Sequence, residues 1–202
     1  MLMVFLDLEG VLVPEIWIEF SRRTGIPELS RTTRDEPDYD KLMRERIDIL
    51  KRYKLGLRDI QAVIKCMEPL HGAREFLHQL RAHVQIAILS DTFYEFAMPL
   101  MSQLDWPTMF CHSIEADAGG CIVDYHLRMR DHKRAAVAAF HALNLKTMAI
   151  GDSYNDIGML AEAGAGILFR PPARIIAEFP QFPVMVNYAQ LRTTVFDASK
   201  II

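Results

Sequence analysis

Two short apolar runs, far apart in the chain, each end directly in carboxylates. The first is Met1–Leu6, followed by Asp7 and Glu9, and the second ends at Ile150, before the loop Gly151–Asp156. Both runs are short and apolar enough for strands buried on both faces, as in a parallel sheet. Ligands of open α/β sheets bind beyond the carboxyl ends of the strands. We therefore expect both acidic groups at one edge of a parallel sheet.

Carboxylates that converge at one edge repel one another unless a cation lies among them. The acidic residues in question are Asp7, Glu9, Asp152 and Asp156. A hard divalent cation with oxygen ligands fits them best, and we expect Mg²⁺. The alternative for Asp7 and Glu9 is a polar turn after a strand. For the second group it is a helix N-cap with a polar first turn.

Size and composition point to a packed globular protein. The chain has 202 residues, of which 50% are hydrophobic and 24% charged, so one domain with an insertion, or a large and a small domain, is expected. The net charge of -3 gives no reason to expect nucleic acid or an anionic membrane as partner. Its three cysteines match no zinc or disulfide spacing. No stretch resembles a signal peptide or a membrane span, and we expect a cytoplasmic enzyme of unspecified oligomeric state.

Apolar runs alternate with helical patterns along most of the chain, which predicts an α/β fold with a doubly wound, mostly parallel sheet. The expected strands are Met3–Leu6, Val84–Leu89, Thr147–Ile150 and Ala165–Phe169, with Val184–Val186 as a short fifth. The expected helices are Gly72–His83, Lys133–Leu143, Asn155–Ala163 and Pro172–Phe179.

One connection is far longer than a crossover between parallel strands requires. More than seventy residues separate Leu6 from Val84. Two stretches within it, Leu42–Tyr53 and Ile60–Met67, carry apolar residues at helical spacing. We call residues 14–69 the helical insertion and expect it to form a cap domain over a core of residues 1–13 and 70–202. Residues 110–130 predict a small β-hairpin that turns at Gly119 and Gly120.

Two further positions carry groups suited to holding a phosphate. Ser90, Asp91 and Thr92 directly follow a predicted strand, where a hydroxyl and backbone N–H groups at the start of a helix make an anion cradle. Ser and Asp are also ordinary N-caps. Lys133 opens a predicted helix and could neutralise a phosphate, although most lysines lie on the solvated surface. We expect the neighbouring His132 at the surface.

The order of these groups along the chain resembles the haloacid dehalogenase superfamily of phosphohydrolases. Asp7 with Glu9, then Ser90, Lys133 and finally the loop Gly151–Asp156 match its four motifs. The loop and the helical insertion resemble the phosphoserine phosphatases within it. Longer stretches resemble the ThrH type, which combines phosphoserine phosphatase and phosphoserine:homoserine phosphotransferase activity. These stretches are Asp7–Ile18, Thr32–Asp35, Ile88–Phe96 and Glu178–Pro183.

The resemblance implies a role for each matched residue. Asp7 would be the nucleophile, and Glu9 the general acid/base, with its backbone carbonyl as a metal ligand. The other implied roles are phosphate and substrate binding by Ser90, Asp91, Lys133 and Asn155, Mg²⁺ binding by Asp7 and Asp152, support by Asp156, and contact with the substrate ammonium by Glu15 and its carboxylate by Arg46. Arg binds carboxylates bidentately, which agrees with the last role. The residues alone favour an exposed helix face for Arg46 and a first-turn acid for Glu15.

The resemblance therefore implies a Mg²⁺-dependent phosphoserine phosphatase that acts through an aspartyl-phosphate and can also pass phosphate to homoserine.

Glu9 stands where most of the superfamily has Asp, and the ThrH type shares this Glu. One extra methylene displaces the acid/base group by about 1 Å, a shift large enough to affect rates. The alternatives are a phosphatase for another small metabolite, a phospho-aspartate receiver module, and a catalytically inactive binding protein. Receivers are shorter and lack both the loop Gly151–Asp156 and an insertion.

Overall fold

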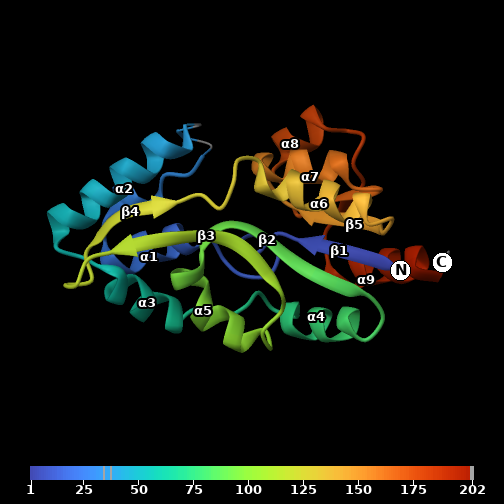
Figure 1. Ribbon diagram of the computed structural model, residues 1–202, viewed down its shortest axis with the longest axis horizontal. Coiled ribbons are helices and arrows are strands. Elements are labelled where there is room, and N and C mark those ends of the chain that lie inside the picture. Colours follow the sequence, from blue (N-terminus) through green and yellow to red (C-terminus); the bar gives the residue numbers. More distant parts are fainter. Residues whose placement is uncertain (34, 37, 201–202) are drawn as a thin grey trace.

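The computed structural model describes residues 1–33, 35–36 and 38–200, which form a seven-stranded sheet flanked by helices (Figure 1). The strand order is β4-β3-β2-β1-β5-β6-β7, and neighbouring strands are parallel except for the antiparallel pair β3 and β4. The strands are β1 (Leu2–Leu6), β2 (Gln85–Phe93), β3 (Met109–Ala116), β4 (Ile122–His126), β5 (Lys146–Gly151), β6 (Ala165–Phe169) and β7 (Val184–Met185). The predicted α/β class with a doubly wound, mostly parallel sheet is confirmed.

Helices cover both faces of the sheet. In the view of Figure 1, α6, α7 and α8 lie above the strands, and α4, α5 and α9 lie below them. Their bounds are α4 (Ala73–Arg81), α5 (Tyr94–Gln103), α6 (His132–Ala142), α7 (Ile157–Glu162), α8 (Ala173–Glu178) and α9 (Tyr188–Lys200), and a short 3-10 helix, η2 (Tyr154–Asp156), precedes α7. Each face of the sheet therefore has its own hydrophobic core cluster.

The central strand β1 brings the two acidic motifs together. All five of its residues are buried, as expected for an apolar run covered on both faces. It pairs with β2 on one side and with β5 on the other, so Leu6 lies opposite both Ile88 and Ile150. Asp7 therefore leaves the sheet beside the loop that follows β5.

The helical insertion lies at the end of the sheet toward which β1 points, and the N-terminus and α9 lie at the opposite end (Figure 1). It contains α1 (Ile16–Thr24), a 3-10 helix η1 (Pro27–Ser30), α2 (Tyr39–Tyr53) and α3 (Leu57–Lys65). The two helices predicted here correspond to α2 and α3. Its independence as a domain stays a prediction. Arg34, in the matched stretch Thr32–Asp35, lies outside the described residues.

The predicted hairpin is present as β3 and β4, joined by a turn at Gly120 with a φ of 86°. One strand end was predicted wrongly. β2 does not stop at Leu89 but continues to Phe93, with a shift of register between these two residues, and α5 follows at once. Ser90–Thr92 therefore belongs to the end of a strand and not to the start of a helix.

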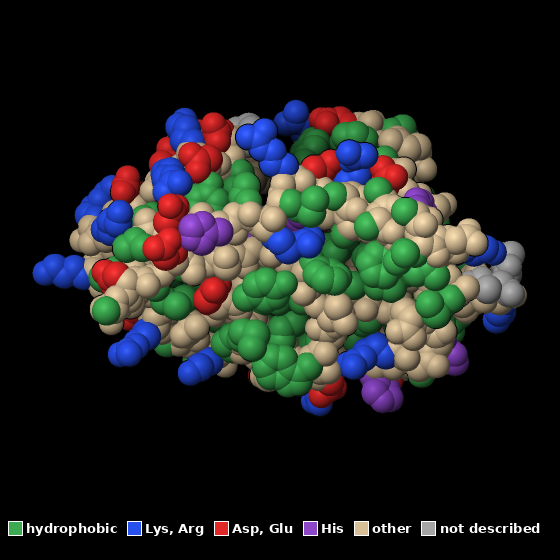
Figure 2. Space-filling view, in the orientation of Figure 1, with side chains coloured by type: hydrophobic (Ala, Val, Ile, Leu, Met, Phe, Trp, Pro, Cys, Tyr) green, Lys and Arg blue, Asp and Glu red, His purple; other side chains and the backbone are tan. Residues whose placement is uncertain are grey.

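Among the described residues, the α-helices α1, α5 and α9 have no counterpart among the predicted elements. α5 carries Pro99 in its interior, which is unfavourable in a helix, and α9 buries only Leu191 and Val195. Hydrophobic side chains gather over α5 in Figure 2. Two exposed hydrophobic residues of this helix are Tyr94 and Met98. Among the residues that the structure describes, every helix is too short or too polar to cross a membrane.

Candidate active site

A cavity of about 100 Å³ opens at the carboxyl ends of the central strands. Its wall comes partly from the sheet and its loops and partly from the helical insertion. It is lined by Asp7, Glu9, Glu15, Trp17, Thr32, Thr33, Tyr39, Leu42, Arg46, Ser90, Asp91, Thr92, Ser153 and Asn155. Seven of the ten predicted site residues are in this set. The other three are Lys133, Asp152 and Asp156, which are buried around Asp7.

Three buried carboxylates crowd together beside this cavity. Oxygen atoms of Asp7, Asp152 and Asp156 lie within 4.8 Å of one another, and the three residues are 4%, 7% and 0% exposed. Burial raises the pKa of Asp7 well above its usual range, the charge of Asp156 raises it further, and Lys133 offsets only part of the increase. An added cation would relieve this repulsion. The donors are hard oxygen atoms, so this set fits Mg²⁺.

The turn after β1 fits closely against the acidic loop. The amide of Leu8 donates a hydrogen bond of 2.7 Å to Asp7 Oδ1 and so orients that carboxylate. Gly10 follows with a φ of 77°, and a Cβ atom there would lie 2.5 Å from the carboxylate carbon of Asp152. Only glycine combines this backbone conformation with so close an approach. The space between Asp7 and Asp152 therefore depends on Gly10.

Asp156 is fully occupied by contacts within the protein. Its Oδ2 accepts hydrogen bonds from the amides of Asp152, at 2.9 Å, and Ser153, at 3.1 Å. Its Oδ1 lies 2.8 Å from Lys133 Nζ. The side chain thus holds the loop and the lysine in place.

Lys133 is buried among acids instead of lying on the surface. Its ammonium lies 3.1 Å from Asp7 Oδ1 and 3.2 Å from Asp91 Oδ2, besides its contact with Asp156. Burial alone would lower the pKa of Lys133, but Asp156, Asp7 and Asp91 outweigh it and raise that pKa well above its usual range. The lysine is therefore a fixed cation beside Asp7. The surface position expected for His132 is wrong, because this residue is 3% exposed.

Ser90 and Asn155 bring further hydrogen-bonding groups to the same edge. Ser90 is 1% exposed, and its hydroxyl accepts from the amide of Thr92 at 3.3 Å. The amide nitrogen of Asn155 donates to Asp91 Oδ2 at 2.5 Å. With Lys133, these groups can surround an anion placed next to Asp7.

Glu9 turns its side chain toward the helical insertion. Its Oε2 accepts a hydrogen bond of 2.8 Å from the amide of Ile16, at the start of α1. Burial, followed by the nearby charge of Glu15, raises the pKa of Glu9 to about 8, although the hydrogen bond from Ile16 and the charge of Arg46 oppose the shift. The Glu9 carboxyl is therefore protonated near neutral pH and can serve as a proton donor.

Arg46 is 6% exposed and does not form part of an exposed helix face. Its guanidinium stacks on the ring of Trp17 at 4.4 Å and donates to the carbonyl of Arg31 at 2.6 Å. Among the described residues, its buried Nε has no hydrogen-bond partner. Burial lowers the pKa of Arg46 to about 10, so it remains cationic at neutral pH. The cavity therefore presents a cation near Glu9 and Glu15, a pattern that complements an amino acid head group.

Sequence reasoning missed two site residues. Tyr39 lines the cavity and donates its hydroxyl to the backbone carbonyl of Asp91 at 3.0 Å. His112 is buried, and its Nε2 lies 3.6 Å from Asp91 Oδ1. Tyr39 follows the matched stretch Thr32–Asp35 at a short distance, which was a weak signal, and nothing in the sequence pattern marked His112.

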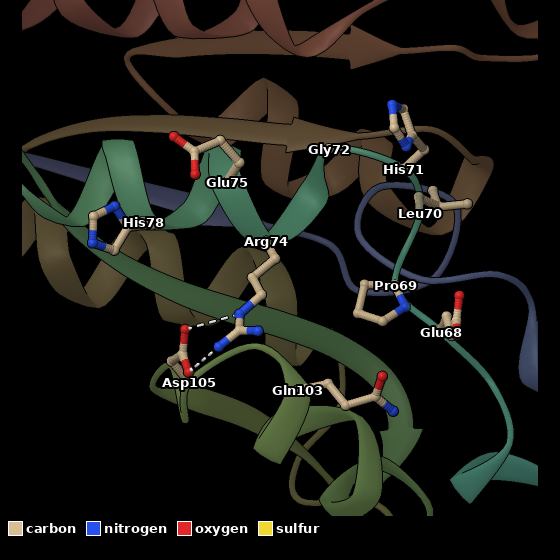
Figure 3. Close-up of a pocket in the computed structure, with 10 residues that line it drawn as sticks. All are labelled: Glu68, Pro69, Leu70, His71, Gly72, Arg74, Glu75, His78, Gln103 and Asp105. Carbon is tan, nitrogen blue, oxygen red and sulfur yellow. Dashed lines mark hydrogen bonds and ion pairs between the residues drawn. The ribbon is translucent and has the colours of Figure 1, made fainter.

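A larger cavity, of about 880 Å³, lies away from these residues and is shown in Figure 3. It is formed by the segment from Glu68 to His78 together with the end of α5 and the following turn. Arg74 reaches across it to form an ion pair with Asp105 at 3.0 Å (Figure 3). None of the predicted site residues lines it, so its size does not make it the candidate site.

Comparison with known proteins agrees with this geometry. Residues 2–164 match the family model of the haloacid dehalogenase-like hydrolases. The chain is 55% identical to the phosphoserine phosphatase ThrH of Pseudomonas aeruginosa, over 96% of this chain and 95% of that one. It is 54% identical to a phosphoserine phosphatase of Pseudomonas syringae pv. tomato, over 96% of this chain and 82% of that one.

Solved structures resemble the chain in fold. A phospho-aspartyl intermediate analogue of phosphoserine phosphatase has a TM-score of 0.74 at 20% identity, covering 90% of this chain and 91% of that one. A phosphoserine phosphatase from T. onnurineus has the same TM-score and identity, with coverages of 96% and 93%.

Proposed function

The chain belongs to the haloacid dehalogenase-like hydrolases and, within them, to the ThrH-type phosphoserine phosphatases, and we propose that it hydrolyses phosphoserine through an aspartyl-phosphate at Asp7. The observation that carries this proposal is the placement of a buried, oriented Asp7 beside Lys133, in a cavity that also holds Arg46 and Glu15. A carboxylate nucleophile, a cation for the phosphoryl group and two charges for an amino acid head are thus available together.

Phosphoserine would bind with its phosphate next to Asp7 and its head group toward the helical insertion. Ser90, Lys133 and Asn155 would hold the phosphate oxygens. The carboxylate of the substrate would accept a hydrogen bond from Arg46 Nε, and the ammonium of the substrate would lie against Glu15. The opposite charges of Arg46 and Glu15 in the cavity favour a substrate with an amino acid head group over a nucleotide or another phosphate ester.

The reaction would proceed in two steps at phosphorus. An Asp7 oxygen attacks, the bond from phosphorus to the serine oxygen breaks, and the Glu9 carboxyl gives its proton to the departing oxygen. Water then attacks the aspartyl-phosphate, Glu9 takes a proton from it, and the bond from phosphorus to Asp7 breaks. Phosphate leaves, and Asp7 returns as a carboxylate.

We also propose that the site takes Mg²⁺, held by Asp7, Asp152 and the backbone carbonyl of Glu9. When bound, the metal would reduce the repulsion between the carboxylates and the phosphate. The raised pKa of Asp7 supports this proposal, because burial and the charge of Asp156 both disfavour its carboxylate form and Lys133 offsets only part of their effect.

Homoserine is the proposed second acceptor. Its hydroxyl would take the place of water, with Glu9 again removing the proton, and phosphohomoserine would form. This extension rests on the resemblance of stretches such as Asp7–Ile18 and Ile88–Phe96 to the ThrH type.

The test is incubation with phosphoserine and Mg²⁺, with and without homoserine, followed by measurement of serine, phosphate and phosphohomoserine. Phosphate release with stoichiometric serine is expected, with part of the phosphate diverted when homoserine is present. No release from phosphoserine, with turnover of another small phosphate ester, would replace this proposal with the alternative metabolite phosphatase.

A further inference from the structure

Asp91 contacts side chains from several separate helices and strands. It lies near the end of β2, and its carboxylate contacts His112 on β3, His132 and Lys133 on α6, and Asn155 on η2. Its backbone carbonyl accepts the hydroxyl of Tyr39 on α2. The proposed mechanism leaves no role for a negative charge at this position, where it would only repel a phosphate.

The two carboxylate oxygens of Asp91 have different partners. Oδ1 faces the imidazoles, with His132 Nε2 at 3.0 Å and His112 Nε2 at 3.6 Å. Oδ2 faces the groups proposed to hold phosphate, with Asn155 Nδ2 at 2.5 Å and Lys133 Nζ at 3.2 Å. One oxygen thus anchors the carboxylate, and the other connects Lys133 to Asn155.

A hydrogen bond at Nδ1 indicates the tautomer of His112. The backbone amide of Arg128 donates to His112 Nδ1 at 3.2 Å, so this nitrogen carries a lone pair and the ring proton lies on Nε2. That proton points at Asp91. A carboxylate with two imidazoles could in principle bind a transition metal, but His112 Nε2 has no lone pair to offer. The cluster is therefore built to donate hydrogen bonds to Asp91.

His132 is neutral and donates in the same direction. Burial lowers its pKa, and the hydrogen bond to Asp91 only partly opposes this. Among the described residues, its buried Nδ1 has no hydrogen-bond partner, so the single proton is best placed on Nε2, toward Asp91. The rings of His112 and His132 pack edge to face, with centroids 4.5 Å apart. Each imidazole thus restricts the movement of the other.

These donors keep Asp91 charged. Burial on its own would raise the pKa of Asp91, but the charge of Lys133 and the hydrogen bonds from His112, His132 and Asn155 lower it well below the usual range. The carboxylate can therefore act as a permanent, rigidly held acceptor.

We propose that Asp91 is a positioning residue, anchored by His112 and His132, which fixes Lys133 and Asn155 relative to one another for phosphate binding. This inference rests on the proposed function only in taking phosphate as the group bound there. The residue aligns two groups from different elements before the ligand arrives, and this alignment outweighs the repulsion of its charge.

The direct test is the binding of inorganic phosphate, measured by calorimetry in the presence of Mg²⁺. Asp91→Asn should weaken phosphate binding about tenfold, the effect of losing one charge-assisted hydrogen bond. Tighter or unchanged binding would overturn the proposal, because it would mean that Asp91 mainly repels the anion. The measurement does not depend on phosphoserine being the substrate, so the two proposals can fail separately.

A pair of variants at His132 tests the anchoring. His132→Gln keeps an N–H donor at a similar reach and should retain phosphate affinity within about twofold, whereas His132→Leu should lose about as much as Asp91→Asn. His126→Leu is the matched control, because His126 is exposed on β4 and its ring contacts the exposed side chain of Glu115. Equal losses in the Gln and Leu variants would overturn the anchoring role.

A second readout is independent of binding. In NMR spectra of the imidazole nitrogens, His112 and His132 should each carry the proton on Nε2 in the unmodified protein. In a folded Asp91→Asn variant, the Nε2 resonance of His132 should shift with the loss of its charged acceptor. A proton on Nδ1 of His112 in the unmodified protein would overturn the assignment.

Discussion

Lys133 Nζ lies 3.1 Å from Asp7 Oδ1, and both side chains are buried. This single cation faces Asp7, Asp91 and Asp156 at once, and so cannot balance their charge. Any additional positive charge nearby would therefore stabilise the ionised carboxylate of Asp7. The predictions on the nucleophile and the metal follow from this imbalance.

Replacing Asp7 with Asn should abolish turnover and leave the fold intact. The amide is nearly isosteric, but it cannot form an aspartyl-phosphate, so the loss should reach several orders of magnitude. Steady-state phosphate release and circular dichroism of both proteins check this. A folded Asn variant with near-normal release would contradict the assignment of Asp7 as nucleophile.

Mg²⁺ should stabilise the protein and be required for activity. Because burial and Asp156 raise the pKa of Asp7, the ionised carboxylate destabilises the metal-free fold as pH rises, and cation binding should reverse this. At a hundred times the dissociation constant, the gain is about 2.7 kcal/mol in free energy of unfolding. Thermal melts with Mg²⁺ and with chelator measure it.

Asp152→Asn removes one of the proposed metal ligands. The melting temperature of this variant should respond much less to Mg²⁺ than that of the unmodified protein. Ca²⁺ should inhibit, because it prefers more ligands at longer distances than Mg²⁺. Full activity after exhaustive chelation would exclude the metal site.

Arg46→Ala should impair phosphoserine far more than a phosphate ester without an amino acid head. Loss of the charged contact should reduce transition-state stabilisation by about 1.5–3 kcal/mol, which lowers kcat/KM for phosphoserine by roughly 10–150-fold. Arg44→Ala is the control, since Arg44 lies on the same helix but is half exposed and pairs with Asp124. Equal losses for both substrates would show that Arg46 acts on folding or on phosphate.

Glu9→Asp should shift the fate of the phospho-enzyme toward hydrolysis. A shorter side chain would place water better, whereas the longer Glu9 leaves time for homoserine to enter. A difference of about 1.4 kcal/mol between the two barriers changes the product ratio tenfold. The ratio of phosphohomoserine to phosphate at fixed homoserine concentration measures it, and an unchanged ratio would assign acceptor choice to the residues around Glu15 and Arg46 instead.

The strands of the central sheet could be predicted well from the sequence, because each is identified by a short run of consecutive residues. β1 and β5 are short, mostly apolar runs that end at Leu6 and Gly151, and burial on both faces leaves such runs few alternatives. The carboxyl end of β2 was less predictable. Ser90 and Thr92 are polar residues that nevertheless belong to the strand, because its pairing with β3 resumes at Phe93 after an irregularity.

The surroundings of Asp91 could not be predicted from local patterns. His112 and His132 are twenty residues apart, on a strand and a helix, and they become neighbours only in the folded chain, where their rings lie 4.5 Å apart. Arg46 is a similar case. An arginine in a helix usually lies on an exposed face, but Arg46 shares the buried face of α2 with Met43 and stacks on Trp17 of α1.

Trapping the phosphorylated intermediate is the most direct test of the account. The enzyme is mixed with labelled phosphoserine and Mg²⁺, quenched in acid within one turnover, and digested for peptide mapping. The account predicts one hydroxylamine-labile phosphoryl group on the peptide that contains Asp7, and none in Asp7→Asn. Label on Ser90, or phosphate release without any labelled protein, would contradict it.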